Sequence, residues 1–222
     1  LYQEFGPLVV DTVYEVLSEH SDFVELSSLW FVKLLMVDIN VGHLHLSEAI
    51  LEMSDGGPMV ADDLLTHLDM DPGIDIGVQR FSLNYALLND DRFDDVAGEG
   101  RVEWFLRRME PEDVRETPSR LRCAPSDYDH SLLSPQLEAL EQELDDEWSD
   151  IAVPDSVQPA ILALTYPHRW AGTLPLSSRL RPLFNLGKAP RQRVVFVDEA
   201  TKDEFVGWVV PDGRYILGLK AW

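Results

Sequence analysis

Five prolines divide the stretch 111–155 into short pieces, and they restrict the fold of this chain more than any other feature. They stand at Pro111, Pro118, Pro125, Pro135 and Pro154. Proline interrupts a helix interior and cannot donate in a central strand, so regular elements in this stretch have to fit between the prolines. One helical segment fits at 135–148, with leucines on one stripe and acids on its other faces. We therefore expect a Pro-rich acidic connector with one amphipathic helix over 111–155, between a domain at 1–110 and another at 156–222.

Acidic residues are distributed unevenly along the 222 residues. The chain holds 40 acids and 18 bases, a net charge of −22, but segment 1–110 has a net charge of −16, segment 111–155 of −10 and segment 156–222 of +4. No acid lies between Asp155 and Asp198. The basic residues of this gap, which follow His168, are Arg169, Arg179, Arg181, Lys188, Arg191 and Arg193. This asymmetry indicates different partners for the segments, although a basic domain could instead complement its own acidic neighbours.

The composition excludes several classes of protein. Apolar residues make up 45% of the chain, which is too many for a disordered chain. A single cysteine, Cys123, excludes a disulfide scaffold and a zinc site built from several cysteines. No apolar run reaches the roughly 18 residues of a spanning helix, and Leu1 to Pro7 has neither the basic start nor the apolar region of a signal peptide. We expect a cytoplasmic protein without membrane contact.

The first part of the chain predicts two helices. Apolar residues recur with helical spacing over 7–19, where Pro7 fits a first turn. Ser27 and Ser28 can cap a second helix over 29–37, whose almost wholly apolar surface predicts that it is buried.

Residues 43–110 predict a compact unit of three short helices followed by a β-hairpin. The helices are expected from Ser47 to about residue 53, at 61–68 and at 78–89, and the strands at 92–96 and 101–106. Gly56-Gly57-Pro58 and Asp71-Pro72-Gly73 separate the helices, and Gly98-Glu99-Gly100 separates the strands. This order of elements is that of a winged helix.

Over about 65 residues this stretch resembles the HARE-type winged helix of the delta subunit of bacterial RNA polymerase. The resemblance depends on the Gly-Pro turn after the first helix, on the sequence Asn89-Asp90-Asp91-Arg92-Phe93 after the third, and on a Gly-containing hairpin that ends in Trp104. It implies a winged-helix fold for residues 43–110.

The third expected helix carries residues that could read DNA bases, but its surroundings are acidic. The candidate readers are Gln79, Arg80, Asn84 and Asn89, and the acids beside them are Asp75, Asp90, Asp91, Asp94 and Asp95. Acids close to a phosphate oppose binding. We therefore favour a protein-binding or structural winged helix over a DNA-reading one.

Residues 156–222 predict an all-β domain. Five strand candidates rich in β-branched and aromatic residues lie at 160–166, 172–176, 193–197, 204–210 and 214–219. Turn residues separate them, and so many short strands favour a small basic β-barrel that leaves no sheet edge exposed. The chain as a whole is then α+β, a helical domain followed by a small barrel.

The order of this last segment is similar to the DNA-binding pseudobarrel of B3 domains and EcoRII-type effector domains. About 50 residues carry the similarity: a strand that enters a Leu-Pro step at Leu174-Pro175, a turn with arginines, and a returning strand at 193–197. The family places a late Gly next to Trp, whereas here Gly218 and Trp222 are separated. The similarity implies DNA binding, and an unrelated small barrel is the alternative.

The basic segment supplies the candidate nucleic-acid-binding residues. Arginine and lysine bind phosphates, and exposed aromatic rings stack on bases. The set is Arg169, Arg179, Arg181, Lys188, Arg191, Arg193 and Trp170.

Our first hypothesis is a non-enzymatic accessory or regulatory protein of nucleic-acid metabolism, of the transcription type. Its basic barrel contacts nucleic acid and its acidic winged helix contacts a protein partner. The alternative is a protein–protein interaction protein that binds no nucleic acid.

No residue pattern predicts catalysis, a metal or a cofactor. His43, His45 and His67 are too few for a zinc site without cysteine ligands. Asp69 could open a calcium loop, but Ile74 stands where an EF-hand needs glycine. Cys123 lacks a histidine in a recognisable pattern, and the acids at 198–199 fit a turn better than a nuclease site. We expect neither catalytic residues nor a bound cofactor.

Overall fold

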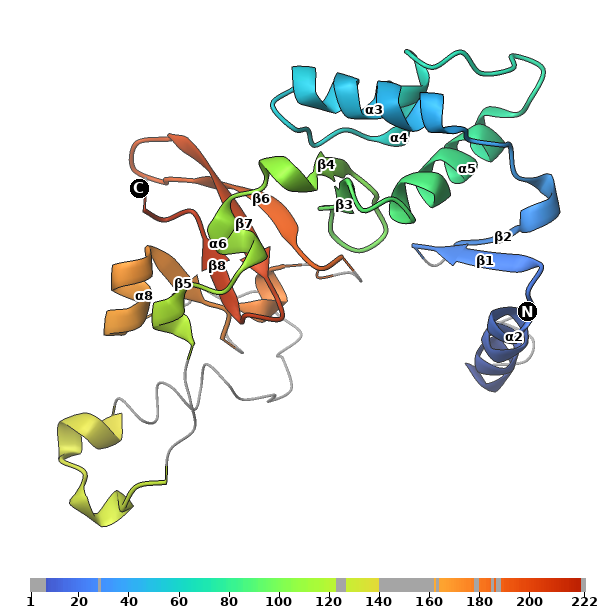
Figure 1. Ribbon diagram of the computed structural model, residues 1–222. Helices are drawn as coiled ribbons and strands as arrows, with labels where there is room; N and C mark the ends of the chain where they lie inside the picture. The colour runs from blue at the N-terminus through green and yellow to red at the C-terminus, as the bar shows by residue number, and fades with distance from the viewer. Residues whose placement is uncertain are drawn as a thin grey trace. The chain divides into compact units, whose positions relative to one another are not determined.

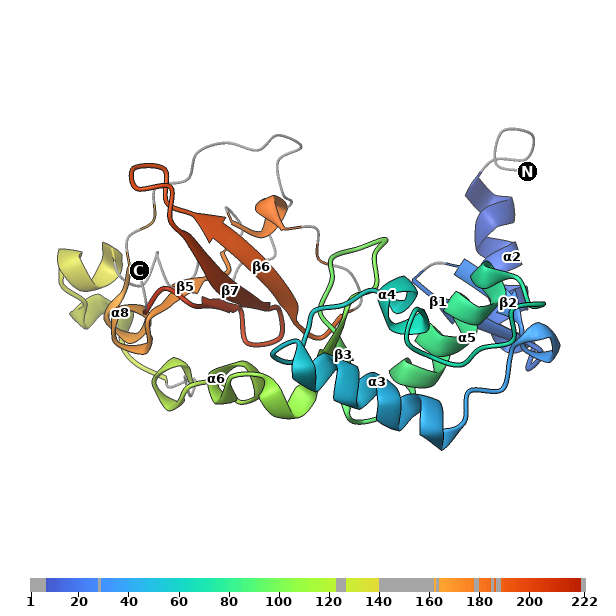
Figure 2. The same cartoon turned by 90° about the horizontal axis from the view of Figure 1, so that it is seen from above.

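The structure, a computed structural model, describes residues 7–27, 29–122, 127–139, 162, 164–177, 180–184, 186 and 189–220 (Figures 1 and 2). It combines helices with small antiparallel sheets, as expected for an α+β protein. The chain divides into two compact units. Unit 1 comprises Leu1–Asp95 and Gly100–Met109, and unit 2 comprises Val96–Glu99 and Glu110–Trp222. In the described ranges no helix is long and apolar enough to cross a membrane.

Unit 1 begins with a helix and a hairpin. Helix α2 (Pro7–Glu19) confirms the expected first helix, and β1 (Phe23–Leu26) pairs antiparallel with β2 (Leu29–Val32). The prediction of a buried helix over 29–37 was wrong. Ser27 adopts a φ of 48° in the turn, and the short apolar run forms β2 followed by the 3-10 turn η1 (Lys33–Leu35). A run of this length and composition fits a strand as well as a helix, and pairing with β1 decides between them.

The next part of unit 1 contains the three helices and the hairpin expected from the sequence. Helices α3 (Val41–Met53), α4 (Ala61–Leu65) and α5 (Ile76–Leu88) precede the antiparallel strands β3 (Phe93–Asp95) and β4 (Trp104–Leu106). Helix α3 begins earlier than expected because Asn40, and not Ser47, caps it; Ser47 is buried within it. The 3-10 turn η2 (Arg107–Met109) follows β4.

Trp104 lies at the centre of the core of unit 1. Its fully buried side chain packs with leucines of all three helices, among them Leu51, Leu64 and Leu83. Its backbone exchanges two hydrogen bonds with Met59, at 2.8 and 3.1 Å, which ties the α3–α4 loop to β4. Gly57 allows this approach, because a Cβ there would lie 2.5 Å from the Trp104 carbonyl oxygen.

Unit 2 is built on a four-stranded antiparallel sheet with the order β5-β8-β7-β6. The strands are β5 (Thr173–Pro175), β6 (Gln192–Val197), β7 (Glu204–Val210) and β8 (Tyr215–Leu217), which confirms four of the five expected strands. The fifth, at 160–166, lies mainly outside the described residues, and Tyr166 begins a helix instead. The closed barrel is not confirmed: in the described part of the chain the sheet is open, with β5 and β6 at its edges.

Hydrogen bonds attach the start of the expected connector to this sheet. Helix α6 (Glu112–Arg115) lies against β8, where the Tyr215 hydroxyl donates to the Asp113 carbonyl over 2.5 Å. Burial raises the pKa of this hydroxyl above its ordinary value. The 3-10 turns η3 (Ser119–Leu121) and η4 (His130–Leu132) follow, and 135–139 are helical. The rest of the amphipathic helix expected at 135–148 lies outside the described residues.

The short helix α8 (Tyr166–Ala171) immediately precedes β5 and lies beside it (Figures 1 and 2). One hydrophobic cluster of unit 2 contains Leu176, Leu180, Val209 and Ile216, and buried Trp208, Val210 and Tyr215 alternate with the last two along β7 and β8. The 3-10 turn η5 (Arg181–Leu183) follows Leu180 and leads toward β6.

Candidate functional site

The expected base-reading residues of α5 make internal hydrogen bonds. The Gln79 amide donates to the carbonyls of Asp71 and Ile74, both over 2.9 Å, and so closes the loop before the helix. The Asn84 amide oxygen accepts the indole N–H of Trp104 over 2.8 Å, and Asn84 is only 8% exposed. Neither side chain is displayed for contact with a base.

The two remaining candidates on α5 are also engaged. The Arg80 Nε donates to Asp62 Oδ1 over 2.7 Å. The Asn89 amide donates to the carbonyl of Tyr85 and thereby bonds the last turn of its own helix. The polar side chains of this helix therefore make contacts within unit 1. This observation and the acidic surroundings of the helix both argue against DNA reading by α5.

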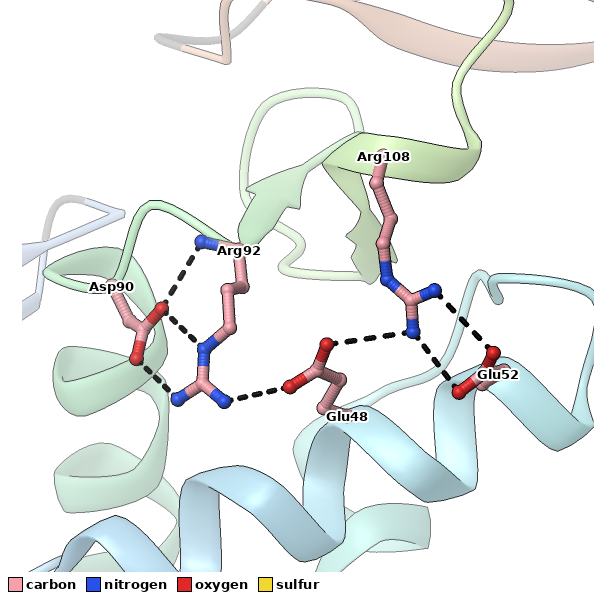
Figure 3. Close-up of polar contacts among 5 residues, drawn as sticks. All are labelled: Glu48, Glu52, Asp90, Arg92 and Arg108. Atoms are coloured by element: carbon pink, nitrogen blue, oxygen red, sulfur yellow. Dashed lines mark hydrogen bonds and ion pairs between the residues drawn. The ribbon is translucent and has the colours of Figure 1, made fainter.

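A network of ion pairs joins α3 to the segments around the β3–β4 hairpin (Figure 3). Arg92 donates to both oxygens of Asp90, at 2.6 and 2.9 Å, and to Glu48 at 2.7 Å. Glu48 lies between two arginines, because Arg108 approaches its other oxygen at 3.4 Å and also binds Glu52 at 3.0 Å. The hydrogen bond from Arg92 holds the pKa of Asp90 below its ordinary value, and Asp90 and Glu48 raise the pKa of Arg92.

Carboxylates hold the other arginines of unit 1 as well. Arg107 donates to both oxygens of Asp94, at 2.6 and 2.9 Å, and Arg101 binds Glu103 at 2.7 Å. With Arg80, Arg92 and Arg108, every arginine of unit 1 thus has an acidic partner within the unit. A phosphate would have to compete with these carboxylates for each guanidinium.

Arg191 of the expected basic set forms a buried ion pair in unit 2. Its Nη1 donates to Glu110 Oε2 over 2.6 Å, and the two side chains are 18% and 0% exposed. Glu110 comes from the acidic part of the sequence and Arg191 from the basic part. Within unit 2, a base of the last segment is therefore neutralised by an acid of an earlier segment. This is the alternative in which the basic segment complements its own acidic neighbours.

The remaining expected basic residues do not lie on a single element. Arg193 is half-buried on the edge strand β6, and Arg181 is exposed at the start of η5. Arg179 and Lys188 lie outside the described residues. Strands β5 and β6 are the opposite edges of the sheet, which places Arg193 three strand spacings, about 14 Å, from the edge next to α8.

Helix α8 brings together Arg169 and Trp170 of the expected set. Tyr166, Arg169 and Trp170 are exposed and stand at positions i, i+3 and i+4, which lie on one face of a helix. His168 points the other way, is buried, and bonds Thr173 Oγ1 over 2.9 Å, so it anchors the helix to β5.

The ends of α8 are also defined by local structure. Pro167 lies in the first turn, where the missing N–H is not needed. Gly172 ends the helix in the left-handed region with a φ of 68°. A Cβ at Gly172 would lie 2.7 Å from the Cβ of Lys220, so the backbone of the C-terminal segment passes directly beside the end of α8. Lys220, which is exposed, therefore lies beside the C-terminal end of α8.

Sequence reasoning missed Arg120, the residue that completes this cluster. From η3 its guanidinium lies over the ring of Trp170, 4.4 Å from the centroid. Trp170 is still 58% exposed and Tyr166 63% exposed. We call Arg120, Tyr166, Arg169, Trp170 and Lys220 the α8 cluster. Among the described residues no ion pair engages Arg120, Arg169 or Lys220. No sequence signal pointed to Arg120, because it stands in the acidic stretch 111–155.

His43 and Asp198, two of the residues weighed for metal binding or catalysis, take part in local backbone hydrogen bonds. His43 Nδ1 accepts from the Asn40 N–H at the start of α3, and Asp198 accepts the N–H groups of Ala200 and Thr201 in the β6–β7 turn. No group of three potential metal ligands occurs among the residues that the structure describes. Cys123 lies outside them.

No protein-family model matches this chain, and neither a curated protein nor a solved structure matches it.

Proposed function

We propose that this chain is a non-enzymatic accessory protein of nucleic-acid metabolism, of the transcription-regulating type, in which unit 2 contacts nucleic acid. The observation that carries the proposal is the α8 cluster. It combines two aromatic rings, each more than half exposed, with cations that no described carboxylate neutralises. Guanidinium groups and exposed rings are the two components of surfaces that hold a sugar-phosphate backbone and its bases.

Unit 1 has a different role in this proposal, namely contact with a protein partner. The order α3-α4-α5-β3-β4, with Met59 bridged to Trp104, supports a winged helix of the kind that the HARE-type resemblance implies. Its expected reading helix keeps Gln79 and Asn84 in internal bonds but exposes the apolar side chains of Ile76 and Leu88. A surface of acids and apolar side chains repels phosphates and suits a protein surface.

A titration of the full chain tests the proposal. Fluorescence anisotropy of labelled single-stranded and duplex DNA, at salt concentrations from about 50 to 200 mM, should show binding that weakens as salt rises. Replacing Arg169 and Arg120 together by glutamate should abolish it. Arg101→Glu is the control, because Arg101 is exposed in unit 1 and paired with Glu103. This charge reversal should leave DNA binding unchanged.

The alternative, a protein–protein interaction protein, draws its support from the Arg191–Glu110 pair. This pair shows that a basic residue of the last segment is neutralised by an acid of the same chain. If neither DNA binds at the lowest salt concentration, the alternative holds and the proposal fails. The full chain has to be used, because a fragment starting at residue 156 lacks Glu110 and the Asp113 carbonyl that bonds Tyr215.

A further inference from the structure

We propose that the α8 cluster binds unpaired bases of a single-stranded nucleic acid and discriminates against the duplex. This inference rests on the proposed function and makes it narrower. It concerns the same five residues and names the form of nucleic acid that they recognise.

The two rings of the cluster form a continuous aromatic surface. Tyr166 and Trp170 are one helical turn apart, with their centroids 5.8 Å apart and their planes inclined by 38°. Both side chains are more than half exposed, although large rings are normally buried in a core. Bases stack on such rings in a way that tolerates any sequence, because every base has a π-face.

Arg120 packs on the ring of Trp170 without covering the whole side chain. Its guanidinium lies 4.4 Å from the centroid of the ring, and Trp170 is still 58% exposed, so part of the side chain is open to a ligand. In the proposed complex a base stacks on the open part of the ring, and the guanidinium that this contact holds beside Trp170 meets a neighbouring phosphate of the same strand. Trp170 thus combines a cation held at its ring with ring surface that is open to a ligand.

The low number of cations argues against duplex binding. Tight duplex binders neutralise many phosphates, whereas this cluster offers three cations on a chain with a net charge of −22. With so few phosphate contacts, affinity has to come mainly from an interaction that does not depend on charge. Stacking supplies it, but only for bases whose faces are exposed, and a duplex hides these faces inside its own stack.

The inference is tested on the full chain with two probes, a labelled oligothymidylate of about 12 nucleotides and a mixed-sequence duplex of the same length. We expect the single strand to bind at least about 10-fold more tightly than the duplex. Trp170→Ala should weaken single-strand binding by about 10- to 100-fold, as expected for the loss of a stacked base. Trp170→Phe should retain most of the affinity for the single strand, because it keeps an aromatic ring.

The control uses a second exposed tyrosine that is paired with a tryptophan. Tyr14 and Trp30 of unit 1 have centroids 5.4 Å apart, but they are not flanked by the α8 cations. Tyr166→Ala should weaken binding of the single strand, whereas Tyr14→Ala should leave it unchanged. Circular dichroism of each variant verifies that α8 and the sheet are still folded.

Failure of this inference alone can be distinguished from failure of the proposed function. Equal or tighter binding of the duplex overturns the inference and leaves the proposed function standing, as does single-strand binding that Trp170→Ala does not weaken. Absence of binding to both probes overturns both proposals. Binding of a proline-rich peptide in place of the oligonucleotides also overturns both, because an exposed Tyr–Trp surface then serves a protein ligand.

Discussion

The guanidinium of Arg120 lies over the indole ring of Trp170, 4.4 Å from its centroid. One residue belongs to the acidic stretch that the prolines interrupt, and the other to the basic segment. Their contact joins η3 to α8 within unit 2. A guanidinium packed on an aromatic ring keeps its charge and its N–H donors, so the contact positions a cation without neutralising it.

Arg120→Ala should therefore weaken nucleic-acid binding without unfolding unit 2. The contact itself is worth about 0.5–1 kcal/mol at an exposed site. The slope of the logarithm of the binding constant against the logarithm of the salt concentration should become shallower by about 0.7 for a single strand, if the guanidinium also meets a phosphate. Arg120→Lys keeps the charge and should retain the slope. An unchanged slope in Arg120→Ala would show that Arg120 meets no phosphate.

The buried pair of Arg191 and Glu110 leads to a prediction about stability. Arg191→Met leaves the fully buried Glu110 carboxylate without this arginine, and removal of one partner of a buried pair costs about 3–5 kcal/mol. The double variant Arg191→Met with Glu110→Leu should be less destabilised, because no buried charge is left behind. Urea unfolding measures both.

A matched substitution at an exposed pair completes that experiment. Arg101 binds Glu103 at the surface, and Arg101→Met should cost no more than about 1 kcal/mol. If Arg191→Met lowered the free energy of unfolding no more than Arg101→Met does, the charge of Glu110 would not depend on Arg191 for compensation.

The sequence predicted the elements whose signals are local. Helical spacing located α2, α4 and α5, and the Gly-Glu-Gly turn located the β3–β4 hairpin. It failed at β2, where a short apolar run fits a strand or a helix and pairing with β1 decides. It also placed the start of α3 at Ser47, because a serine that could cap a helix is not distinguishable from one buried within it.

The candidate site was predictable only in part. Arg169 and Trp170 stand together in the sequence, and the period of a helix brings Tyr166 to the same face. Arg120 and Lys220 reach the cluster through tertiary contacts that no local pattern encodes. Charge counting likewise could not reveal that Arg191 is paired with Glu110, because residue type does not indicate which base is buried.

Asn84 provides a test of the role of α5. Asn84→Leu leaves the buried indole N–H of Trp104 without its acceptor, which should lower the free energy of unfolding by about 1–3 kcal/mol. Because Asn84 does not read bases in our proposal, nucleic-acid binding by the folded variant should be unchanged. Asn89→Ala, at the exposed end of the same helix, is the control and should have a small effect on stability. A loss of binding in folded Asn84→Leu would place base recognition on α5.

Asp90 should make the stability of unit 1 dependent on pH. Its hydrogen bonds from Arg92 hold its pKa in the folded protein below the ordinary value of 3.8, so folding favours the ionised form. The stabilisation is present above about pH 4 and is lost as the pH falls through the lowered pKa of the folded state. Asp90→Asn should lower the free energy of unfolding by about 1 kcal/mol at pH 7.

The difference in the free energy of unfolding between the wild type and Asp90→Asn should become smaller as the pH falls below about 4. Protonation of Asp90 then removes the same charge from the wild type. Asp91→Asn is the matched control, since Asp91 is the adjacent carboxylate and is fully exposed at 3.6 Å from Arg107. It should show little effect at either pH. Urea unfolding of the three proteins at pH 7 and at about pH 3 measures the two differences. If the Asp90→Asn difference stays constant between these pH values, the Asp90–Arg92 contact does not favour the ionised carboxylate.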